Sequence, residues 1–178
     1  SMEALYEEVP GIEAGSMILC WFGNDLRCGD CLIEPKVEQY ALDGENMPWS
    51  VSGLTRADAK LVPIDEGRPV YGGTPTDQSV VEAIRAMNAA GKAVMFYPFI
   101  LMDQMKGNGL PDPYSDAPDQ PHLPWRGRIT TAKALGQPGS TDGTAAARAE
   151  VDAFFGTASA ADYANGDGAV TYSGPSDW

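Results

Sequence analysis

The sequence is short of basic residues, of histidine and of long apolar runs, and these shortages exclude several classes of function. Its 12 lysines and arginines stand against 25 aspartates and glutamates, so the net charge is −13. Nucleic-acid phosphates and anionic lipid surfaces would repel such a chain, and we expect no nucleic-acid partner. No apolar run approaches the ~20 residues that span a bilayer, and no basic and apolar leader opens the chain, so we expect no membrane insertion.

Cysteine is also scarce, with three residues at Cys20, Cys28 and Cys31. An odd number does not form a disulfide framework. Cys28 and Cys31 have the C-x-x-C spacing of zinc sites and redox pairs, and Cys20 with His122 would complete a Cys₃His set. However, the chain has no second C-x-x-C, and the residues after Cys31 are a poor helix start for a thioredoxin-like pair. We therefore expect plain thiols, no metal and no cofactor.

The clearest structural pattern lies between residues 71 and 103. Thr74 is placed to cap a helix that starts at about Pro75, with Asp77 as the acidic partner of a capping box. Apolar residues then recur at the three-and-four spacing of one helix face, and Gly91 supplies the left-handed residue that ends helices. This stretch therefore predicts an amphipathic helix.

The residues after that helix predict a buried strand. An apolar run over residues 93–101 is typical of a strand covered on both faces, as in a parallel sheet between helices. Pro98 has no N–H for a ladder hydrogen bond, so we expect a bulge or a lost partner there. Asp103 comes just past the end of the run, where α/β folds place their sites.

The remaining elements complete an α/β pattern. An earlier apolar run at 17–22 predicts the first buried strand, and a second helix is expected over 144–155 with its apolar side buried. Residues 104–142 contain six prolines and predict one long irregular loop. The order strand, loop, helix, strand, long loop, helix predicts an α/β fold in a single domain over residues 1–178. Shorter features are expected at 49–53 (a short hairpin or an edge segment), 57–62 (a strand) and 65–68 (a turn).

Asp25 and Asp103 are the two carboxylates that we expect at strand ends, and they are the candidate catalytic residues. Next to Asp25, Asn24 and Arg27 would bind sugar hydroxyls while Trp21 stacks on the ring of a sugar. The alternative is structural: Asp25 would pair with Arg27 or cap the next element, and Asp103 would cap a turn.

Three further residues are candidate substrate contacts. Trp125 and Arg126 combine an aromatic face with a planar donor, which suits carbohydrate or a carboxylated partner. The alternative is that the tryptophan is a buried anchor for the long loop. Tyr97 is the third candidate, although a tyrosine within a strand is more often part of the core.

Five blocks of the sequence carry a resemblance to a known family. They are WFGNDLRCG (21–29), GRPVYGGTP (67–75), FYPFILMD (96–103), GNGLPDP (107–113) and PWRGRIT (124–130). Together they are similar to the TIM-barrel-like, glycoside-hydrolase-like domain of the large tail-tip hub proteins of gene transfer agents and related tailed phages. The resemblance covers about residues 16–178, with the blocks in the family's order.

This resemblance implies both a fold and a setting. A complete barrel takes ~250 residues, so the chain would be a partial TIM-barrel-like β/α fragment with parallel strands. In the family, further strands follow the stretch that corresponds to Trp178, and one ends in a glutamate suited to acid/base work. Open strand edges of such a fragment predict a homodimer, or an edge capped by the long loop.

The resemblance also implies a role. The chain would be a virion protein, made in the cytoplasm and acting at the host cell envelope, which contacts cell-wall glycan or peptidoglycan alongside other tail or baseplate proteins. The alternative is an active glycoside hydrolase that uses the strand-end carboxylates. Such enzymes need two carboxyl groups ~5 Å apart to retain configuration, or ~6.5–9.5 Å apart to invert it.

Overall fold

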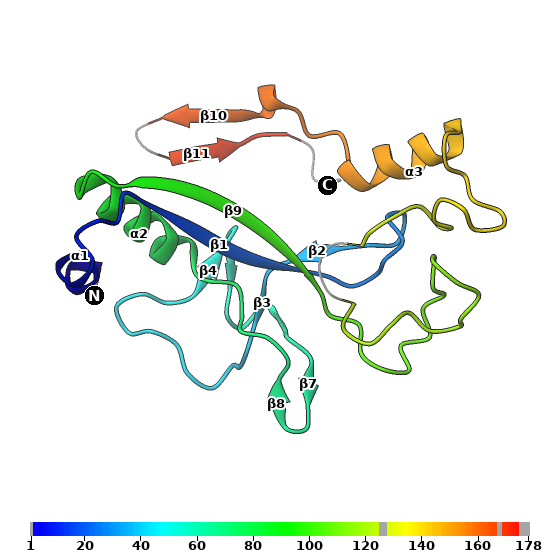
Figure 1. Cartoon of the computed structure of the whole chain (residues 1–178), viewed down its shortest axis with the longest axis horizontal. Helices are drawn as coiled ribbons and strands as arrows, with labels where there is room; N and C mark the ends of the chain where they lie inside the picture. Colours follow the sequence, from blue (N-terminus) through cyan, green and yellow to red (C-terminus); the bar gives the residue numbers. More distant parts are fainter. Residues whose placement is uncertain (1, 125–127, 167–168, 175–178) are drawn as a thin grey trace. The chain divides into compact units, whose positions relative to one another are not determined.

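The computed structural model describes residues 2–124, 128–166 and 169–174. The contacts divide the chain, whose helices and strands are labelled in Figure 1, into two compact units. The first unit comprises Ser1–Gly23 and Ile33–Asp103, and the second comprises Asn24–Leu32 and Gln104–Trp178. The short segment after the first long strand therefore belongs with the C-terminal half of the sequence.

A three-stranded sheet organises the first unit. Strands β1 (Ala14–Gly23) and β9 (Ala93–Met102) run parallel, in continuous register from Ala14 opposite Ala93 to Gly23 opposite Met102. Strand β2 (Ile33–Glu34) pairs antiparallel with the end of β1, which gives the order β2-β1-β9. The register continues through Pro98 with no bulge, because β9 is the last strand of this sheet and needs ladder bonds on one side only.

Helix α2 (Asp77–Ala89) precedes β9 and packs against it. Val80 and Met87 are its buried residues, and a Cβ atom at Gly15 would collide with the Met87 side chain, so the glycine allows close contact between helix and strand. After the C-cap residue Ala90, Gly91 has φ +71° and the Lys92 N–H bonds to the Met87 carbonyl. The predicted helix and its glycine stop are thus present.

The predicted capping box is wrong. The helix begins two residues later than expected, with Thr76 at the N-cap position and no side-chain cap bond. Thr74 is buried instead: its Oγ1 donates to the Cys20 carbonyl at 2.8 Å and accepts from the Lys36 N–H at 3.2 Å. Thr74 therefore ties β1 to the segment at Lys36 rather than starting the helix.

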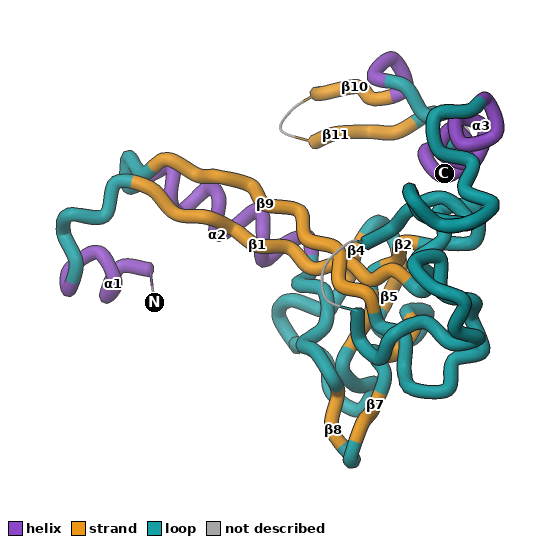
Figure 2. The backbone as a smooth tube through the Cα atoms, turned by 45° about the vertical axis from the view of Figure 1, so that its right-hand side comes forward, coloured by secondary structure: helices purple, strands orange, loops and turns teal. Residues whose placement is uncertain are grey.

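Short strand pairs make up the rest of the first unit, together with the N-terminal helix α1 (Met2–Glu8). Two hairpins turn through pairs of residues with positive φ, Ser52-Gly53 and Glu66-Gly67, a combination that matches the twist of hairpin strands. The second hairpin consists of strands β7 and β8, which are labelled in Figure 2. The pairs are β3 (Lys36–Val37) with β6 (Lys60–Leu61), β4 (Ser50–Val51) with β5 (Leu54–Thr55), and β7 (Ile64–Asp65) with β8 (Arg68–Pro69).

The core of the first unit consists of two apolar clusters. One contains Val37, Trp49, Val51 and Ala59, with the half-buried Trp21 packed against it. The other contains Phe22, Val62 and Leu101, with Cys20, Val70, Tyr71 and Phe99 around it. Both clusters lie toward the C-terminal ends of β1 and β9, so this end of the sheet is the well-packed one.

The second unit contains helix α3 (Ala145–Phe155), the 3₁₀ turn η1 (Ala160–Asp162) and the hairpin of β10 (Tyr163–Gly166) and β11 (Ala169–Tyr172). Thr144 caps α3 by accepting from the Ala147 N–H. The described residues between β9 and α3 form no helix and no strand beyond one bridge, between Arg27 and Thr130.

The predicted TIM-barrel-like fragment is wrong. The molecule is mixed α/β, but its sheets are small and mostly antiparallel or short, and the described residues contain only three α-helices. Outside the β1/β9 pair, frequent turns limit the strands: the strand expected over 57–62 is reduced to the two-residue β6. A barrel needs repeated strand and helix units of similar length, and the residues that the structure describes contain only one such crossover.

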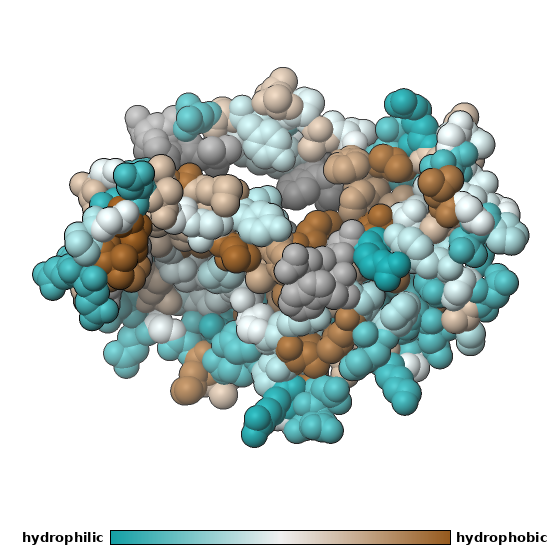
Figure 3. All heavy atoms as spheres, in the orientation of Figure 1, coloured by the Kyte–Doolittle hydropathy of each residue, from teal (hydrophilic) through white to brown (hydrophobic). Residues whose placement is uncertain are grey.

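Two burial predictions are also wrong. Strand β9 is not covered on both faces, since Met95, Phe96 and Tyr97 are 61%, 55% and 43% exposed. Helix α3 has no buried residue, and Phe155 is 69% exposed. In the space-filling view, brown apolar residues reach the surface among hydrophilic ones (Figure 3). None of the described helices has the length and apolar character needed to cross a membrane.

Candidate functional site

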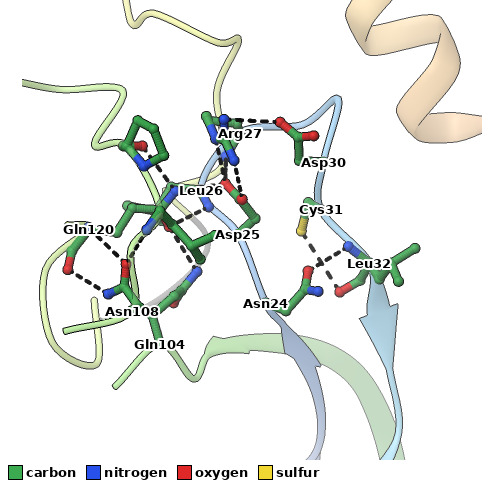
Figure 4. Close-up of polar contacts among 12 residues, drawn as sticks. Asn24, Asp25, Leu26, Arg27, Asp30, Cys31, Leu32, Gln104, Asn108 and Gln120 are labelled. Atoms are coloured by element: carbon green, nitrogen blue, oxygen red, sulfur yellow. Dashed lines mark hydrogen bonds and ion pairs between the residues drawn. The ribbon is translucent and has the colours of Figure 1, made fainter. Parts of the chain in front are cut away.

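A buried polar cluster of the second unit surrounds Asp25, which is 3% exposed (Figure 4). Its Oδ1 accepts from the Arg27 backbone N–H at 2.8 Å, from Arg27 Nε at 3.1 Å and from Gln120 Nε2 at 2.7 Å. Its Oδ2 accepts from Arg27 Nη2 at 2.7 Å. Both carboxylate oxygens are therefore bound by donors of the protein itself.

Local sequence explains this arrangement. Strand β1 ends at Gly23, and an aspartate that accepts from the N–H two residues on forms a compact turn, as Asp25 does with Arg27. Arg27 also pairs with Asp30 at 3.2 Å. Asn24 Oδ1 accepts from the Leu32 N–H at 2.8 Å and so closes the loop that leaves β1. The predicted sugar contacts Asn24 and Arg27 are thus engaged in holding their own loop.

Gln120 joins this loop to the long segment after β9. Besides donating to Asp25, its side chain accepts from the Leu26 N–H at 2.9 Å and from Gln104 Nε2 at 3.1 Å. Asn108 fixes Gln120 in turn: its Nδ2 donates to the Gln120 carbonyl and its Oδ1 accepts from the Gln120 N–H. Neither Gln120 nor Asn108 was among the predicted site residues, because no spacing rule links Gln120 to an aspartate 95 positions earlier.

The electrostatics of Asp25 favour the ionised form. Burial by itself would raise the pKa of Asp25, but hydrogen bonds from the Arg27 side chain and backbone and from Gln120, together with the Arg27 charge, bring that pKa below its usual value. A general acid needs the opposite, a carboxyl group that keeps its proton near neutral pH. Asp25 is therefore suited to positioning Arg27 and Gln120 rather than to protonating a leaving group.

Asp103 belongs to the first unit and is also paired. Its Oδ2 lies 2.6 Å from Lys36 Nζ, and the two side chains are 5% and 8% exposed. Its backbone N–H bonds to the Gly23 carbonyl, which extends the parallel ladder by one step. Burial, reinforced by the nearby Asp103 charge, raises the pKa of Tyr71. Asp103 thus serves as the buried partner of a lysine.

The predicted site residues are divided between the two units. Asp25, Asn24 and Arg27 share a loop of the second unit, whereas Asp103, Trp21 and Tyr97 belong to the first. Trp21 is half-buried against the Trp49 cluster. Tyr97 meets Phe99 edge-on, with ring centroids 5.8 Å apart. Trp125 and Arg126, predicted as substrate contacts, lie outside the described residues.

The cysteines carry free thiols. Cys28 and Cys31 are buried and Cys20 is partly buried. Burial raises the pKa of all three thiols, which makes them poorer nucleophiles and poorer metal ligands at neutral pH. No group of three or more metal-ligating side chains is found within the described ranges.

Comparison with protein-family models and with curated proteins found no match to this chain.

Proposed function

We propose that this chain belongs to a tail-tip hub protein of a gene transfer agent or related tailed phage, and that it contacts cell-wall glycan during host attachment and DNA entry. The five sequence blocks, in the family's order over most of the chain, support this setting. On this proposal the protein acts at the host cell envelope as part of a virion, with other tail or baseplate proteins as its neighbours.

The hydrogen bonds and ion pairs of the two candidate carboxylates, Asp25 and Asp103, support binding of a glycan rather than its cleavage. Asp25 is saturated by Arg27 and Gln120, and Asp103 is paired with Lys36 in a buried position. A glycosidase needs one carboxyl group that holds a proton and a second that attacks or activates water. Two carboxylates already bound by cations and amides supply neither group, and this is the observation that carries the proposal of a binding role.

Sedimentation with purified peptidoglycan tests the proposal. We expect the chain to pellet with peptidoglycan sacculi. It should release no soluble glycan, and the turbidity of the sacculi should not fall over hours. An unrelated acidic protein of similar charge serves as control for trapping, and cellulose serves as control for non-specific adsorption. Failure to pellet with peptidoglycan or with any other host surface glycan would rule out the proposed contact.

The alternative function, hydrolysis of the same glycan, is separated by the same samples. Release of reducing ends by the wild-type chain would show cleavage. Loss of that release in Asp25→Asn or Asp103→Asn, with the circular dichroism of the folded wild type retained, would then assign the carboxylate to the reaction. Unchanged release in both variants would remove both residues from the mechanism.

A further inference from the structure

We propose that the pocket lined by Tyr40, Asp43, Thr55, Arg56 and Ala57 is a binding subsite for a neutral sugar unit. All the residues that line this pocket belong to the first unit, and none of them is among the site residues predicted from sequence. The inference rests on the proposed glycan contact and adds the surface on which that contact is made. The volume of the pocket, about 370 Å³, lies within the ~300–1,000 Å³ typical of small-molecule sites.

The pocket combines an aromatic face with polar groups. The Tyr40 side chain is 51% exposed, and its hydroxyl donates to the Ala59 carbonyl at 2.8 Å, which fixes the direction of the ring. Arg56 lies beside Asp43, with Nε donating to Asp43 Oδ1 at 3.2 Å. An oriented, half-exposed ring next to a fixed guanidinium and a carboxylate suits a ligand with one apolar face and a rim of hydroxyl groups.

The polar groups are held in place without a ligand. Arg56 Nη1 donates to Glu38 Oε1 at 3.0 Å and to the Gln39 carbonyl at 2.9 Å, and the arginine side chain is only 14% exposed. Asp43 Oδ1 also accepts from the N–H groups of Trp49 and Gly44. Such a preformed site loses little conformational entropy when it binds.

A second device stiffens the loop that carries Tyr40 and Asp43. The Gln39 side chain donates to the Leu42 carbonyl and accepts from the Leu42 N–H, both at 2.8 Å. These two hydrogen bonds between the Gln39 side chain and the Leu42 backbone close the turn that contains Tyr40. The buried Trp49, whose Nε1 donates to the Thr74 carbonyl at 2.6 Å, anchors the far end of the same loop.

One donor and one acceptor remain open to a ligand. Within the described part of the chain, Arg56 Nη2 and Asp43 Oδ2 make no hydrogen bond, although the other polar atoms of both groups are engaged. Adjacent hydroxyl groups of a sugar each donate and accept, so they match a neighbouring donor and acceptor pair. Arg56 Nη2 and Asp43 Oδ2 thus select for hydroxyl groups on the ligand, while the Tyr40 ring supplies apolar contact area.

The charge of the pocket excludes anionic ligands. The Arg56 guanidinium is outnumbered by the Asp43 and Glu38 carboxylates, and hydrogen bonds bring the pKa of both carboxyls below its usual value. For Asp43 the largest cause is the hydrogen bond from the Trp49 N–H; for Glu38, burial opposes the shift and backbone and Arg56 bonds outweigh it. Both groups are charged at neutral pH, and the chain as a whole carries −13. A carboxylated or sulfated sugar would therefore be repelled, which leaves a neutral one.

An NMR titration of the full chain with tri-N-acetylchitotriose, a neutral trisaccharide, tests this subsite. We expect amide shifts confined to residues 38–57 and a measurable Kd. Oligogalacturonate of the same length, which is anionic, is expected to produce no shifts there. Tyr40→Leu removes the ring, and Asp43→Asn replaces the open acceptor while it keeps an oxygen for the Trp49 and Gly44 N–H groups.

Each variant is expected to raise Kd by about tenfold or more, since each removes a direct contact with the sugar. Phe155→Ala, which removes a more exposed aromatic ring from the other unit, is the matched control and should leave Kd unchanged. Circular dichroism would confirm that each variant folds. Peptidoglycan sedimentation of the same variants is measured in parallel.

The outcomes distinguish the subsite from the proposed function. If the wild-type chain pellets with peptidoglycan but the trisaccharide shifts no residue in 38–57, or if both pocket variants bind as the wild type does, the subsite is wrong and the glycan contact stands. If the wild type binds neither the trisaccharide nor peptidoglycan, both inferences are wrong. Stronger binding of oligogalacturonate than of the neutral trisaccharide would overturn the assigned ligand class.

Discussion

The Nζ atom of Lys36 lies 2.6 Å from Oδ2 of Asp103, and water reaches less than a tenth of either side chain. The pair joins the end of β9 to β3, and its two residues are 67 positions apart in the sequence. A buried pair of this kind adds little to stability compared with apolar residues of the same shape, but loss of one partner leaves a charge in a place that cannot solvate it.

We therefore expect Asp103→Asn to lower the free energy of unfolding by ~3–5 kcal/mol, because Lys36 loses its counter-charge. The double variant Lys36→Met/Asp103→Leu should recover most of that loss. Urea titration followed by tryptophan fluorescence measures both. A single variant within ~1 kcal/mol of the wild type would mean that water reaches the lysine and that the pair is not buried in solution.

A pH dependence follows from Asp25. Its pKa is lowered in the folded chain, so the carboxylate stabilises the fold at every pH above the unfolded value of ~3.9, and this contribution disappears as the pH falls through the lower, folded value. We expect Asp25→Asn to be clearly less stable than the wild type at about pH 7, with a smaller difference at about pH 2.5. Urea unfolding at the two pH values measures this. An equal difference at both pH values would show that folding does not lower the pKa of Asp25.

Much of the first unit could be predicted from local patterns. The helix and the strand after it were found almost where expected, because apolar spacing and a left-handed glycine are properties of neighbouring residues. The structural alternative for Asp25, pairing with Arg27, is confirmed for the same reason, since the two are two positions apart. Burial could not be predicted in this way: β9 has the composition of a core strand, yet its first half is exposed.

The polar partners lay beyond sequence reasoning. Gln120 and Lys36 meet their aspartates across 95 and 67 positions, and neither glutamine nor lysine has a spacing pattern that marks it in advance. The Tyr40 and Arg56 pocket was missed because its loop has no periodicity, and its order comes from side-chain bonds such as Gln39 to Leu42. Thr74 was misassigned because a threonine before a proline fits a helix cap as well as it fits a buried cross-link.

The thiols give a prediction that also tests the zinc alternative. Because burial raises the pKa of Cys20, Cys28 and Cys31, we expect the native chain to react with a disulfide reagent at least about tenfold more slowly than the chain in guanidinium. Elemental analysis of the same sample is expected to find no bound zinc. Fast reaction of two thiols in the native state would point instead to an accessible redox pair at Cys28 and Cys31.

The exposed part of β9 bears on the homodimer, which remains a prediction from sequence. Ile18 and Tyr97 are register partners and lie on one face with Met95, and all three are at least 43% exposed. Among the described residues, no strand pairs with the outer edge of β9. We expect light scattering to show a dimer that Met95→Lys weakens, because a charge on an exposed sheet opposes edge pairing. Leu135→Lys, at another exposed apolar residue, is the control. A monomer at all concentrations would contradict this expectation.

Two adjacent glycines offer a matched pair of variants. A Cβ atom at Gly73 would lie 2.6 Å from Glu38 Oε2, 3.0 Å from the Lys36 carbonyl oxygen and 3.2 Å from the Glu38 nitrogen, whereas one at Gly72 would meet nothing within 4 Å. We expect Gly73→Ala to cost about 1–3 kcal/mol of unfolding free energy and Gly72→Ala to be nearly neutral. Thermal unfolding of the two proteins side by side measures the difference. Equal midpoints would show that the backbone at Lys36 yields easily.

Thr74 has a consequence for the kinetics of folding. Its side chain reaches Cys20 and Lys36, 54 and 38 positions away, and its carbonyl receives the Trp49 indole from 25 positions away. Each of these bonds forms only after the chain between its two residues has closed into a loop, and loop closure of this kind slows the search for the native state. Helix α2 is local and can form early, but the Trp49 anchor of the loop that carries Tyr40 and Asp43 is in place only when its long-range bond to Thr74 is made.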